Sequence, residues 1–503
     1  MTTARVTLDP HFTVGDIDRR LFGSFVEHLG RCVYDGIYEP SHPTADEDGF
    51  RRDVVDLVRE LGVSTVRYPG GNFVSGYRWE DGVGPRDQRP RRLDLAWHST
   101  ETNEIGLDEF ARWVHKVDGE LMYAVNLGTR GVLDALDVLE YANVRGGTTL
   151  SEQRIANGTP EPHGIRMWCL GNEMDGPWQL GASTPAEYAE IAAKTASAMR
   201  QIDPGVELVV CGSSGAQMPT FGEWERVVLE RTYDDVDFIS CHAYYEPRGG
   251  DYASFLASAT DMDRFIETVV ATADHVKALK RSDKQIHISF DEWNVWYQSR
   301  FNDVDKITGI EHWPVAPRLL EDSYSVADAV VFGNLMISLL RHADRVKAAS
   351  LAQLVNVIAP IMTEPGGPAW RQTTFFPFAE TARLARGRAL EVRLEAPEYD
   401  TALYGRVPLV DAVATHDPDT GAATVFAVNR SLDDALTLEI DLVQFGSRER
   451  VTARVLHDDD IHARNTLDAP ERVGLRDLPV TRVDDRTVSV VLPAVSWAVV
   501  ELR

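Results

Sequence analysis

The sequence predicts an α/β protein of two domains, a (β/α)8 TIM barrel followed by an antiparallel, jelly-roll-like β-sandwich. The chain has 503 residues, which is too long for one ordinary core but suits a large barrel with an accessory domain. Strand-like apolar runs alternate with amphipathic segments through about the first 380 residues, the pattern of a parallel sheet with crossover helices. After about residue 382 the helical periodicity fades and short β-rich runs replace it.

Eight apolar runs in the first region are the candidate barrel strands. Helical segments lie between them, and eight such alternations are the number that a closed barrel of this type requires. In chain order the runs are Leu21–Val26, Ser64–Tyr68, Leu121–Asn126, Ile165–Leu170, Glu207–Cys211, Val236–His242, Gln285–Phe290 and Lys347–Leu354.

Two of the intervening segments carry clear helical signals. Phe50–Leu61 places its valines and leucines at helical spacing. Pro185–Gln201 follows a Ser-Thr-Pro-Ala-Glu start, in which the proline suits the first helical turn. We therefore expect the barrel to occupy residues 18–381.

The β-rich runs of residues 382–503 are expected to form the sandwich. The N-terminal run Arg5–Leu8 precedes the first barrel strand, so residues 1–17 are expected to add a strand to this second domain. The other candidate strands are Ala423–Val428, Leu436–Ile440, Arg450–Leu456, Val488–Leu492 and Ser496–Leu502.

The charge of the chain excludes some classes of partner. With 51 basic and 78 acidic residues the formal net charge is −27, which would repel nucleic acid and anionic membrane surfaces. The N-terminus lacks the apolar stretch of a secretory signal, and the most apolar helix candidate, Val326–Leu340, is interrupted by Asp328 and Asn334. We expect a cytoplasmic protein whose four cysteines, which show no CxxC spacing, are buried free thiols.

Two glutamates follow strand candidates that would face each other across the barrel mouth. Glu173 follows the fourth run and Glu292 follows the seventh, and functional groups of such barrels lie at the carboxyl ends of the strands. Trp97, Tyr244 and Trp296 are expected nearby. Paired carboxyls perform acid, base and nucleophilic chemistry while aromatic faces contact sugar rings, so the combination favours a glycoside substrate.

Metal chemistry is the competing use of some of these side chains. His28, His98, His242 and Glu292 are possible ligands, but no HxH or HExxH spacing connects them. Because two carboxyls suffice for glycoside hydrolysis, we expect neither a metal nor an organic cofactor.

Four motifs resemble one known family. They are Glu27-His28 after Leu21–Phe25, the segment Arg67–Asn72, the segment Trp168–Trp178, and Asp291-Glu292-Trp293. In this order and spacing they resemble the intracellular α-L-arabinofuranosidases of glycoside hydrolase family 51, from about residue 20 to the Pro368–Thr373 region and more weakly through the sandwich.

The resemblance implies a retaining mechanism with Glu173 as general acid/base and Glu292 as nucleophile. Such a mechanism needs the two carboxyls about 5 Å apart, one protonated and one ionised. Arg67 is similar to the arginine beside the nucleophile in this clan, and Tyr244 to the phenol that orients it. His242, at the end of the sixth strand, is expected to support the site.

The same resemblance implies the sugar contacts. The groups expected to bind the furanose hydroxyls are Glu27, Asn72, Asn172 and Gln353, and a shift of register would exchange Gln353 with Asn356. Trp97 would wall the sugar pocket and Trp296 its entrance, and the alternative for both tryptophans is packing within the barrel.

The expected substrate is a terminal α-L-arabinofuranosyl group on an arabino- or arabinoxylo-oligosaccharide, released by an exo-acting enzyme. A homo-oligomer, by resemblance a hexamer, is expected. The alternatives are a hydrolase of another furanoside such as β-D-galactofuranoside, a side activity on β-xylosides or glucans, a catalytically silent sugar-binding barrel, and a metal-dependent hydrolase.

Overall fold

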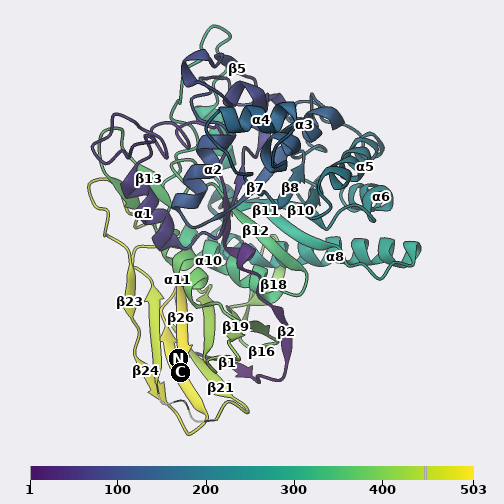
Figure 1. Ribbon diagram of the computed structural model, residues 1–503. Helices are drawn as coiled ribbons and strands as arrows, with labels where there is room; N and C mark the ends of the chain where they lie inside the picture. The colour runs from purple at the N-terminus through teal and green to yellow at the C-terminus, as the bar shows by residue number, and fades with distance from the viewer. Residues whose placement is uncertain (1, 447, 449) are drawn as a thin grey trace.

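The larger part of the computed structural model, which describes residues 2–446, 448 and 450–503, is a closed barrel of eight parallel strands (Figure 1). Each strand overlaps one of the eight predicted runs, so the predicted barrel is confirmed. The strands are β3 (Gly23–Phe25), β4 (Thr65–Tyr68), β7 (Glu120–Val125), β8 (Met167–Leu170), β9 (Glu207–Val210), β10 (Phe238–Tyr245), β11 (His287–Val295) and β12 (Val346–Ala352).

Helices surround this barrel, and three of them, α1, α5 and α10, overlap helix candidates named from the sequence. The helix expected over Phe50–Leu61 begins at Arg52, because Phe50 and Arg51 form isolated bridges with the preceding loop. Thr184 and Glu187 form a capping box at the start of α5. The helices are α1 (Arg52–Leu61), α2 (Leu107–Lys116), α3 (Val132–Asn143), α4 (Thr149–Ala156), α5 (Pro185–Ile202), α6 (Glu223–Thr232), α7 (Tyr252–Leu256), α8 (Ala259–Lys280), α9 (Gln298–Arg300), α10 (Val326–Arg341) and α11 (Phe375–Leu384).

The C-terminal domain consists of two packed sheets with their own apolar core. One sheet has the order β16-β1-β21-β25-β24 and the other β2-β15-β19-β20-β26-β22-β23. Their strands are β1 (Thr2–Leu8), β2 (Thr13–Asp16), β15 (Arg388–Leu390), β16 (Arg393–Glu395), β19 (Val410–His416), β20 (Ala423–Asn429), β21 (Leu436–Leu442), β22 (Val451–Leu456), β23 (Leu475–Asp477), β24 (Val480–Arg482), β25 (Thr487–Leu492) and β26 (Ser496–Leu502).

The N-terminal strand departs from the predicted all-antiparallel arrangement. β1 pairs with β21 in parallel, from Thr2 opposite Leu436 to Leu8 opposite Leu442. A parallel neighbour is possible because the whole barrel lies between these two strands in the sequence, which provides a long connection. The domain boundaries at residues 17 and 381 stay a prediction.

Helix α10 joins the barrel to the sandwich. It is buried along nearly its whole length, and Gly333 lies so close to the sandwich that a Cβ there would stand 2.3 Å from Cδ1 of Trp497. Asn334 donates to Asp411 at 2.8 Å, and Arg430 donates to Asn334 at 2.6 Å and to Asp411 at 2.7 Å. The apolar helix singled out in the sequence is thus a domain interface, and among the described residues no helix is long and apolar enough to cross a membrane.

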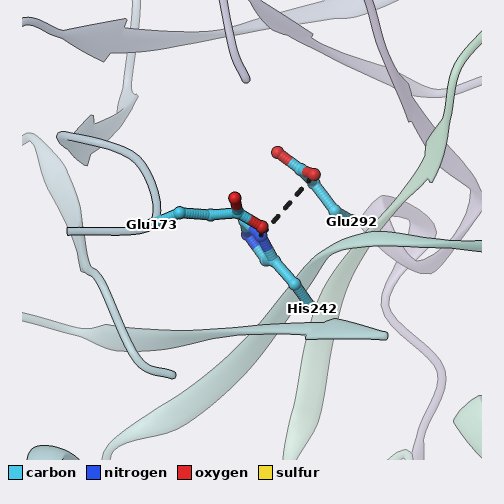
Figure 2. Close-up of side chains that lie close together, drawn as sticks. All are labelled: Glu173, His242 and Glu292. Atoms are coloured by element: carbon cyan, nitrogen blue, oxygen red, sulfur yellow. Dashed lines mark hydrogen bonds and ion pairs between the residues drawn. The ribbon is translucent and has the colours of Figure 1, made fainter. Parts of the chain in front are cut away.

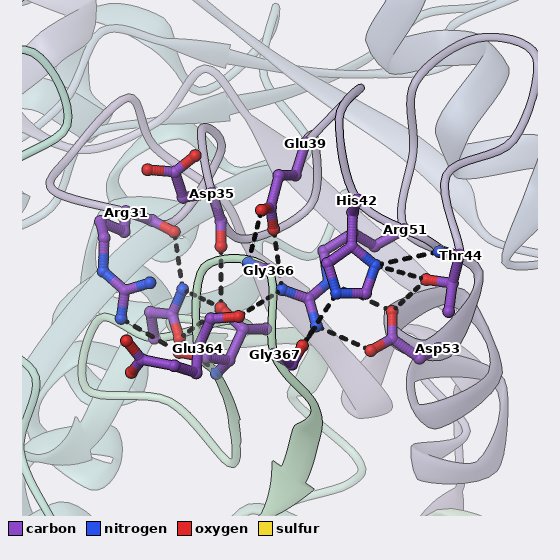
Figure 3. A network of polar contacts seen from close by, with 12 residues as sticks. Arg31, Asp35, Glu39, His42, Thr44, Arg51, Asp53, Glu364, Gly366 and Gly367 are labelled. Atoms are coloured by element: carbon purple, nitrogen blue, oxygen red, sulfur yellow. Dashed lines mark hydrogen bonds and ion pairs between the residues drawn. The ribbon is translucent and has the colours of Figure 1, made fainter.

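A second buried polar network fixes the loops beside β3 and β12 (Figure 3). The guanidinium of Arg51 is fully buried and donates to Glu39 at 2.9 Å, to Asp53 at 2.7 Å, and to the backbone oxygen of Gly367 at 2.7 Å. Gly367 lies in the hairpin of β13 (Ile361–Thr363) and β14 (Ala369–Arg371). The network therefore holds the segment after β12 against the loop after β3.

Replacing Arg430 with methionine should destabilise the domain interface. Asp411 would stay buried after losing one of its cationic partners, and breaking a buried ion pair in this way typically costs about 3–5 kcal/mol. Because Arg341 also contacts Asp411, we expect the lower end of that range. Chemical unfolding monitored by tryptophan fluorescence measures the change, with the exposed Arg406→Ala as control, and an unfolding free energy equal to that of the wild type would contradict it.

Candidate active site

Glu173 reaches the barrel mouth because β8 ends three residues before it. Gly171 and Glu173 both adopt left-handed backbone conformations, with φ of 93° and 43°. The chain therefore leaves the sheet at Gly171, and the alternation of side chains along a strand no longer applies. Such a conformation is uncommon for a glutamate and occurs mostly where the surrounding structure imposes it.

Glu173, His242 and Glu292 converge at the centre of the mouth (Figure 2). Each offers a nitrogen or oxygen atom, and these three atoms all lie within 4.8 Å of one another. His242 Nδ1 is 2.8 Å from Glu173 Oε1 and 3.6 Å from Glu292 Oε2. Carboxyls about 5 Å apart suit a retaining glycosidase, whereas inverting enzymes separate them by about 6.5–9.5 Å to admit a water molecule.

Glu292 is buried but compensated by cationic and neutral donors. Arg67 Nη1 donates to its Oε1 at 2.9 Å, and the Tyr244 hydroxyl donates to its Oε2 at 2.6 Å. Burial raises the pKa of Glu292, and the charge of Glu173 raises it too, whereas His242, Arg67 and Tyr244 lower it. The charged form that a nucleophile needs is therefore held by direct contacts on both oxygens.

His242 carries a positive charge over a wide pH range. Burial alone would lower its pKa, but the neighbouring Glu292, Asp291 and Glu173 carboxylates raise it to about 10. Its Nε2 lies 2.8 Å from Asp291 Oδ1, opposite the contact of Nδ1 with Glu173. The imidazolium thus bridges the carboxyl groups of Glu173 and Asp291.

Asp291 is a site residue for which the sequence analysis predicted no role. Its neighbour Glu292 would face the opposite side of a regular strand, but the pairing of β11 with β12 is irregular between Phe290 and Trp293. Both acids therefore contact groups of the mouth, since Asp291 also lies 3.7 Å from Arg67 Nε. The adjacent acidic pair was the sequence signal that could have identified it.

The same cluster has the composition of a metal site, yet its protonation favours another use. A metal binds the neutral imidazole through a nitrogen lone pair. Both nitrogens of His242 face carboxylates, and its pKa of about 10 keeps a proton on each at neutral pH. A cation at this position would first have to displace a proton, so the arrangement suits proton transfer better.

One end of the mouth is closed around Glu27. Its Oε1 accepts from Phe73 N at 2.8 Å and Trp97 Nε1 at 2.7 Å, and Gln353 Nε2 is 3.2 Å from its Oε2. Gly71, with φ of 57°, passes so close that a Cβ there would stand 2.2 Å from Glu27 Oε2. Burial raises the pKa of Glu27 well above its usual value.

A single cavity of about 810 Å³ contains most of the predicted residues. Gln353 lines it, whereas Asn356 turns away to contact Arg31 and Thr363, so the structure distinguishes the two alternatives. The other predicted residues in its lining are Glu27, Asn72, Trp97, Glu173, His242, Tyr244, Glu292 and Trp296.

Arg67 and Asn172 are outside the set of residues that line the cavity. Asn172 Oδ1 accepts from Arg67 at 2.6 Å, and its amide nitrogen is 3.3 Å from Gln179. Its predicted contact with a sugar hydroxyl therefore stays a prediction. Trp178, to which the sequence analysis gave no role, lines the cavity and donates to Glu173 Oε2 at 2.6 Å.

The two tryptophans of the mouth pack against neighbouring rings and also line the cavity. Trp296 packs edge to face on Tyr244, with ring centroids 5.0 Å apart, and Trp97 packs in the same way on Phe301 at 6.0 Å. Both tryptophans are only partly buried and line the cavity while they pack against the core. Packing and ligand contact are thus compatible at these positions.

Family models and full-length relatives of this chain are all α-L-arabinofuranosidases. Residues 57–265 match the model of the α-L-arabinofuranosidase 1 domain, and residues 291–496 match that of the α-L-arabinofuranosidase C-terminal domain. An exo-α-(1→6)-L-arabinofuranosidase of Bifidobacterium longum is 60% identical over 99% of this chain and 97% of its own. An intracellular exo-α-(1→5)-L-arabinofuranosidase of Streptomyces lividans is 61% identical, over 99% of this chain and 75% of its own.

Solved structures of α-L-arabinofuranosidases also match this chain. A family 51 α-L-arabinofuranosidase from Bifidobacterium longum matches with a TM-score of 0.96 and 54% identity, covering 100% of both chains. An arabinose complex of the α-L-arabinofuranosidase from Thermotoga maritima matches with a TM-score of 0.88 and 32% identity over 99% of both chains.

His242→Asn should remove a pH-dependent part of the stability. The pKa of about 10 in the folded protein exceeds the ordinary value of 6.5, so the bound proton stabilises the fold fully below about pH 6.5. This contribution is lost as the pH rises towards 10. The unfolding free energy of the wild type, from urea titrations at several pH values, should fall more steeply between about pH 7 and 10 than that of the variant. The exposed His11→Asn is the control, and equal slopes in wild type and His242→Asn would contradict the assignment.

Proposed function

This chain belongs to the family 51 α-L-arabinofuranosidases, and we propose that it releases terminal α-L-arabinofuranosyl groups from arabino- and arabinoxylo-oligosaccharides by double displacement. The observation that carries the proposal is the buried trio Glu173, His242 and Glu292, whose contact atoms lie within 4.8 Å of one another. This spacing lets one carboxyl attack the anomeric carbon while the other protonates the departing oxygen.

The charges around the trio support an assignment of roles. Three carboxyls, of Glu173, Asp291 and Glu292, surround the two cations His242 and Arg67. One added proton makes the cluster neutral. Glu292 and Asp291 each contact both cations, whereas of the two cations Glu173 contacts His242, so Glu173 is the carboxyl to which we assign the proton.

In the first step Glu292 bonds to the anomeric carbon and Glu173 gives its proton to the leaving oxygen. The negative charge of Glu292 disappears in the ester, and Glu173 becomes an anion beside His242, 2.8 Å away, and Trp178, 2.6 Å away. In the second step Glu173 takes a proton from water, which attacks the ester and restores Glu292. The product keeps its anomeric configuration.

The closed end of the cavity supports exo action. Glu27, Gln353 and Trp97 converge there, so a sugar bound beside them has no space for a chain beyond it. The relatives at 60% and 61% identity are both named as exo enzymes, but for different linkages, 1→6 and 1→5. We therefore propose the terminal arabinofuranosyl group as the unit recognised, whichever linkage it carries.

The cellular context forms a separate proposal. The Streptomyces lividans relative is named as intracellular, and we propose that this chain acts in the cytoplasm on oligosaccharides.

We also propose a homo-oligomer, with a hexamer as the expected state by resemblance to the family. Light scattering after size exclusion measures it, and a monomer would contradict it.

Paired variants test the mechanism. Glu292→Ala should lose nearly all activity on 4-nitrophenyl α-L-arabinofuranoside, and azide should restore turnover as the inverted glycosyl azide, because the small anion fills the space of the missing carboxylate. Glu173→Ala should lose activity strongly on substrates with poor leaving groups and much less on the activated nitrophenyl glycoside, since only the former need a proton donor.

The outcomes distinguish the alternatives. Full activity of Glu292→Ala would place the nucleophile elsewhere, and tight sugar binding without hydrolysis in the wild type would indicate a silent sugar-binding barrel. A higher kcat/KM on β-D-galactofuranoside would change the substrate assignment. Loss of activity on addition of a chelator would favour the metal-dependent alternative.

A further inference from the structure

The cavity that holds the catalytic pair is larger than one terminal sugar requires. Its volume of about 810 Å³ is near the upper end of the range, about 300–1,000 Å³, of pockets that enclose drug-sized ligands. The closed end around Glu27 accounts for only one side of it. The rest of the cavity therefore extends beyond the place of the terminal sugar.

The order of the barrel strands shows on which side of the mouth the rest of the cavity lies. Glu27, Asn72 and Gln353 follow β3, β4 and β12, which are neighbours on one side of the barrel. Across the mouth lie β8, β9 and β10, followed by Glu173, Gln217 and Arg248, which also line the cavity. Because Glu173 protonates the leaving oxygen, the leaving group departs towards this second side.

The C-terminal region contributes to the lining of the cavity on this side. A separate hairpin of β17 (Glu398–Thr401) and β18 (Gly405–Pro408) carries Leu403 and Tyr404 at its tip, and both line the cavity. Figure 1 places β18 where the sandwich meets the barrel. No sequence signal had connected this hairpin with the site.

The hairpin tip is held against the barrel by specific hydrogen bonds. Ser254 Oγ in α7 accepts from the backbone nitrogens of Ala402 and Leu403 at 3.1 and 3.2 Å, and Tyr399 donates to the backbone oxygen of Ala253 at 2.9 Å. Ser254 is itself buried. The tip therefore has a defined position relative to the cavity.

The groups at this end have the chemistry of a sugar site. We name it the hairpin arm: Glu246, Arg248, Asp261, Leu403 and Tyr404. Leu403 is 60% exposed and Tyr404 partly exposed, so apolar and aromatic surface faces the cavity. Arg248 is an exposed donor, and Asp261 accepts from Tyr245 at 3.2 Å. The two carboxylates disfavour an anionic ligand, so a neutral ligand with many hydroxyls suits the arm best.

We propose that the hairpin arm is a subsite for the sugar units of the leaving group beyond the first, which pack on Tyr404 and hydrogen-bond to Arg248. The proposal rests on the proposed function, because it assigns the leaving group of the same reaction. It makes the C-terminal region a determinant of substrate length.

A kinetic series tests the hairpin arm. We would measure kcat/KM on 4-nitrophenyl α-L-arabinofuranoside and on arabino-oligosaccharides of two, three and four units. For the wild type we expect kcat/KM to rise from two to three units. In Arg248→Ala and Tyr404→Ala, the ratio of kcat/KM on the longer oligosaccharides to that on the nitrophenyl glycoside should fall about three- to tenfold, mainly through KM, the size of one lost stacking or hydrogen-bond contact.

Matched variants make the result decisive. Arg406→Ala removes an exposed arginine of the same hairpin that pairs with Glu398 at 3.1 Å and does not line the cavity, so its ratio should equal that of the wild type. Tyr404→Phe keeps the ring and should retain most of the preference. An unchanged ratio in both Arg248→Ala and Tyr404→Ala, including a uniform loss on all substrates, would overturn the proposal. A wild type inactive on the nitrophenyl glycoside would instead reject the proposed function.

Discussion

The structure depends on one electrostatic constraint, which is that two glutamates must stay close together in a buried site. Unit charges 4.8 Å apart repel by roughly 3–4 kcal/mol at an effective dielectric constant of about 20. Arg67 and His242 oppose this repulsion. Both contact Asp291, and Arg67 also contacts Glu292 while His242 lies near both glutamates. The cluster is therefore a balanced set of charges with room for one mobile proton. Its protonation pattern, more than the presence of either glutamate alone, makes a retaining mechanism possible.

The barrel supplies the rigidity that such a set of charges needs. His242 and Glu292 lie within β10 and β11, neighbouring strands that pair directly at these two residues, whereas Glu173 lies on the turn after β8. Irregular pairing of β11 near Glu292 and the left-handed conformation of Glu173 bring these side chains to the mouth from positions that regular strands would not offer. The sandwich contributes from outside, since α10 connects it to the barrel core through Asn334, Asp411 and Arg430. Local irregularity at the site is thus supported by a regular and well-packed scaffold.

Much of the barrel was predictable because its strands leave a strong one-dimensional pattern. All eight apolar runs became barrel strands, and the polar clusters at their ends led to the residues that line the cavity. Asp291 and Trp178 were not given roles. The acidic pair with Glu292 was a signal for Asp291, but the hydrogen bonds of Asp291 to His242 and of Trp178 to Glu173 depend on the fold. Asn172 was predicted to contact sugar; its side chain contacts Arg67 and Gln179, and the sugar contact stays a prediction. The parallel pairing of β1 with β21 was also missed, since strand direction depends on a partner more than 400 residues away.

The sequence by itself determined the fold class and predicted the two glutamates and their paired-carboxyl chemistry, because periodicity and residue type are properties of short segments. It also carried the four motifs that indicated the family. Only the tertiary structure decided which carboxyl contacts which cation, because the charge on His242 depends on three acids that converge from β8 and β11. Only the tertiary structure placed the tip of a hairpin from beyond residue 400 at the far end of the cavity. Both are consequences of distance in space, which a linear chain does not encode in any local pattern.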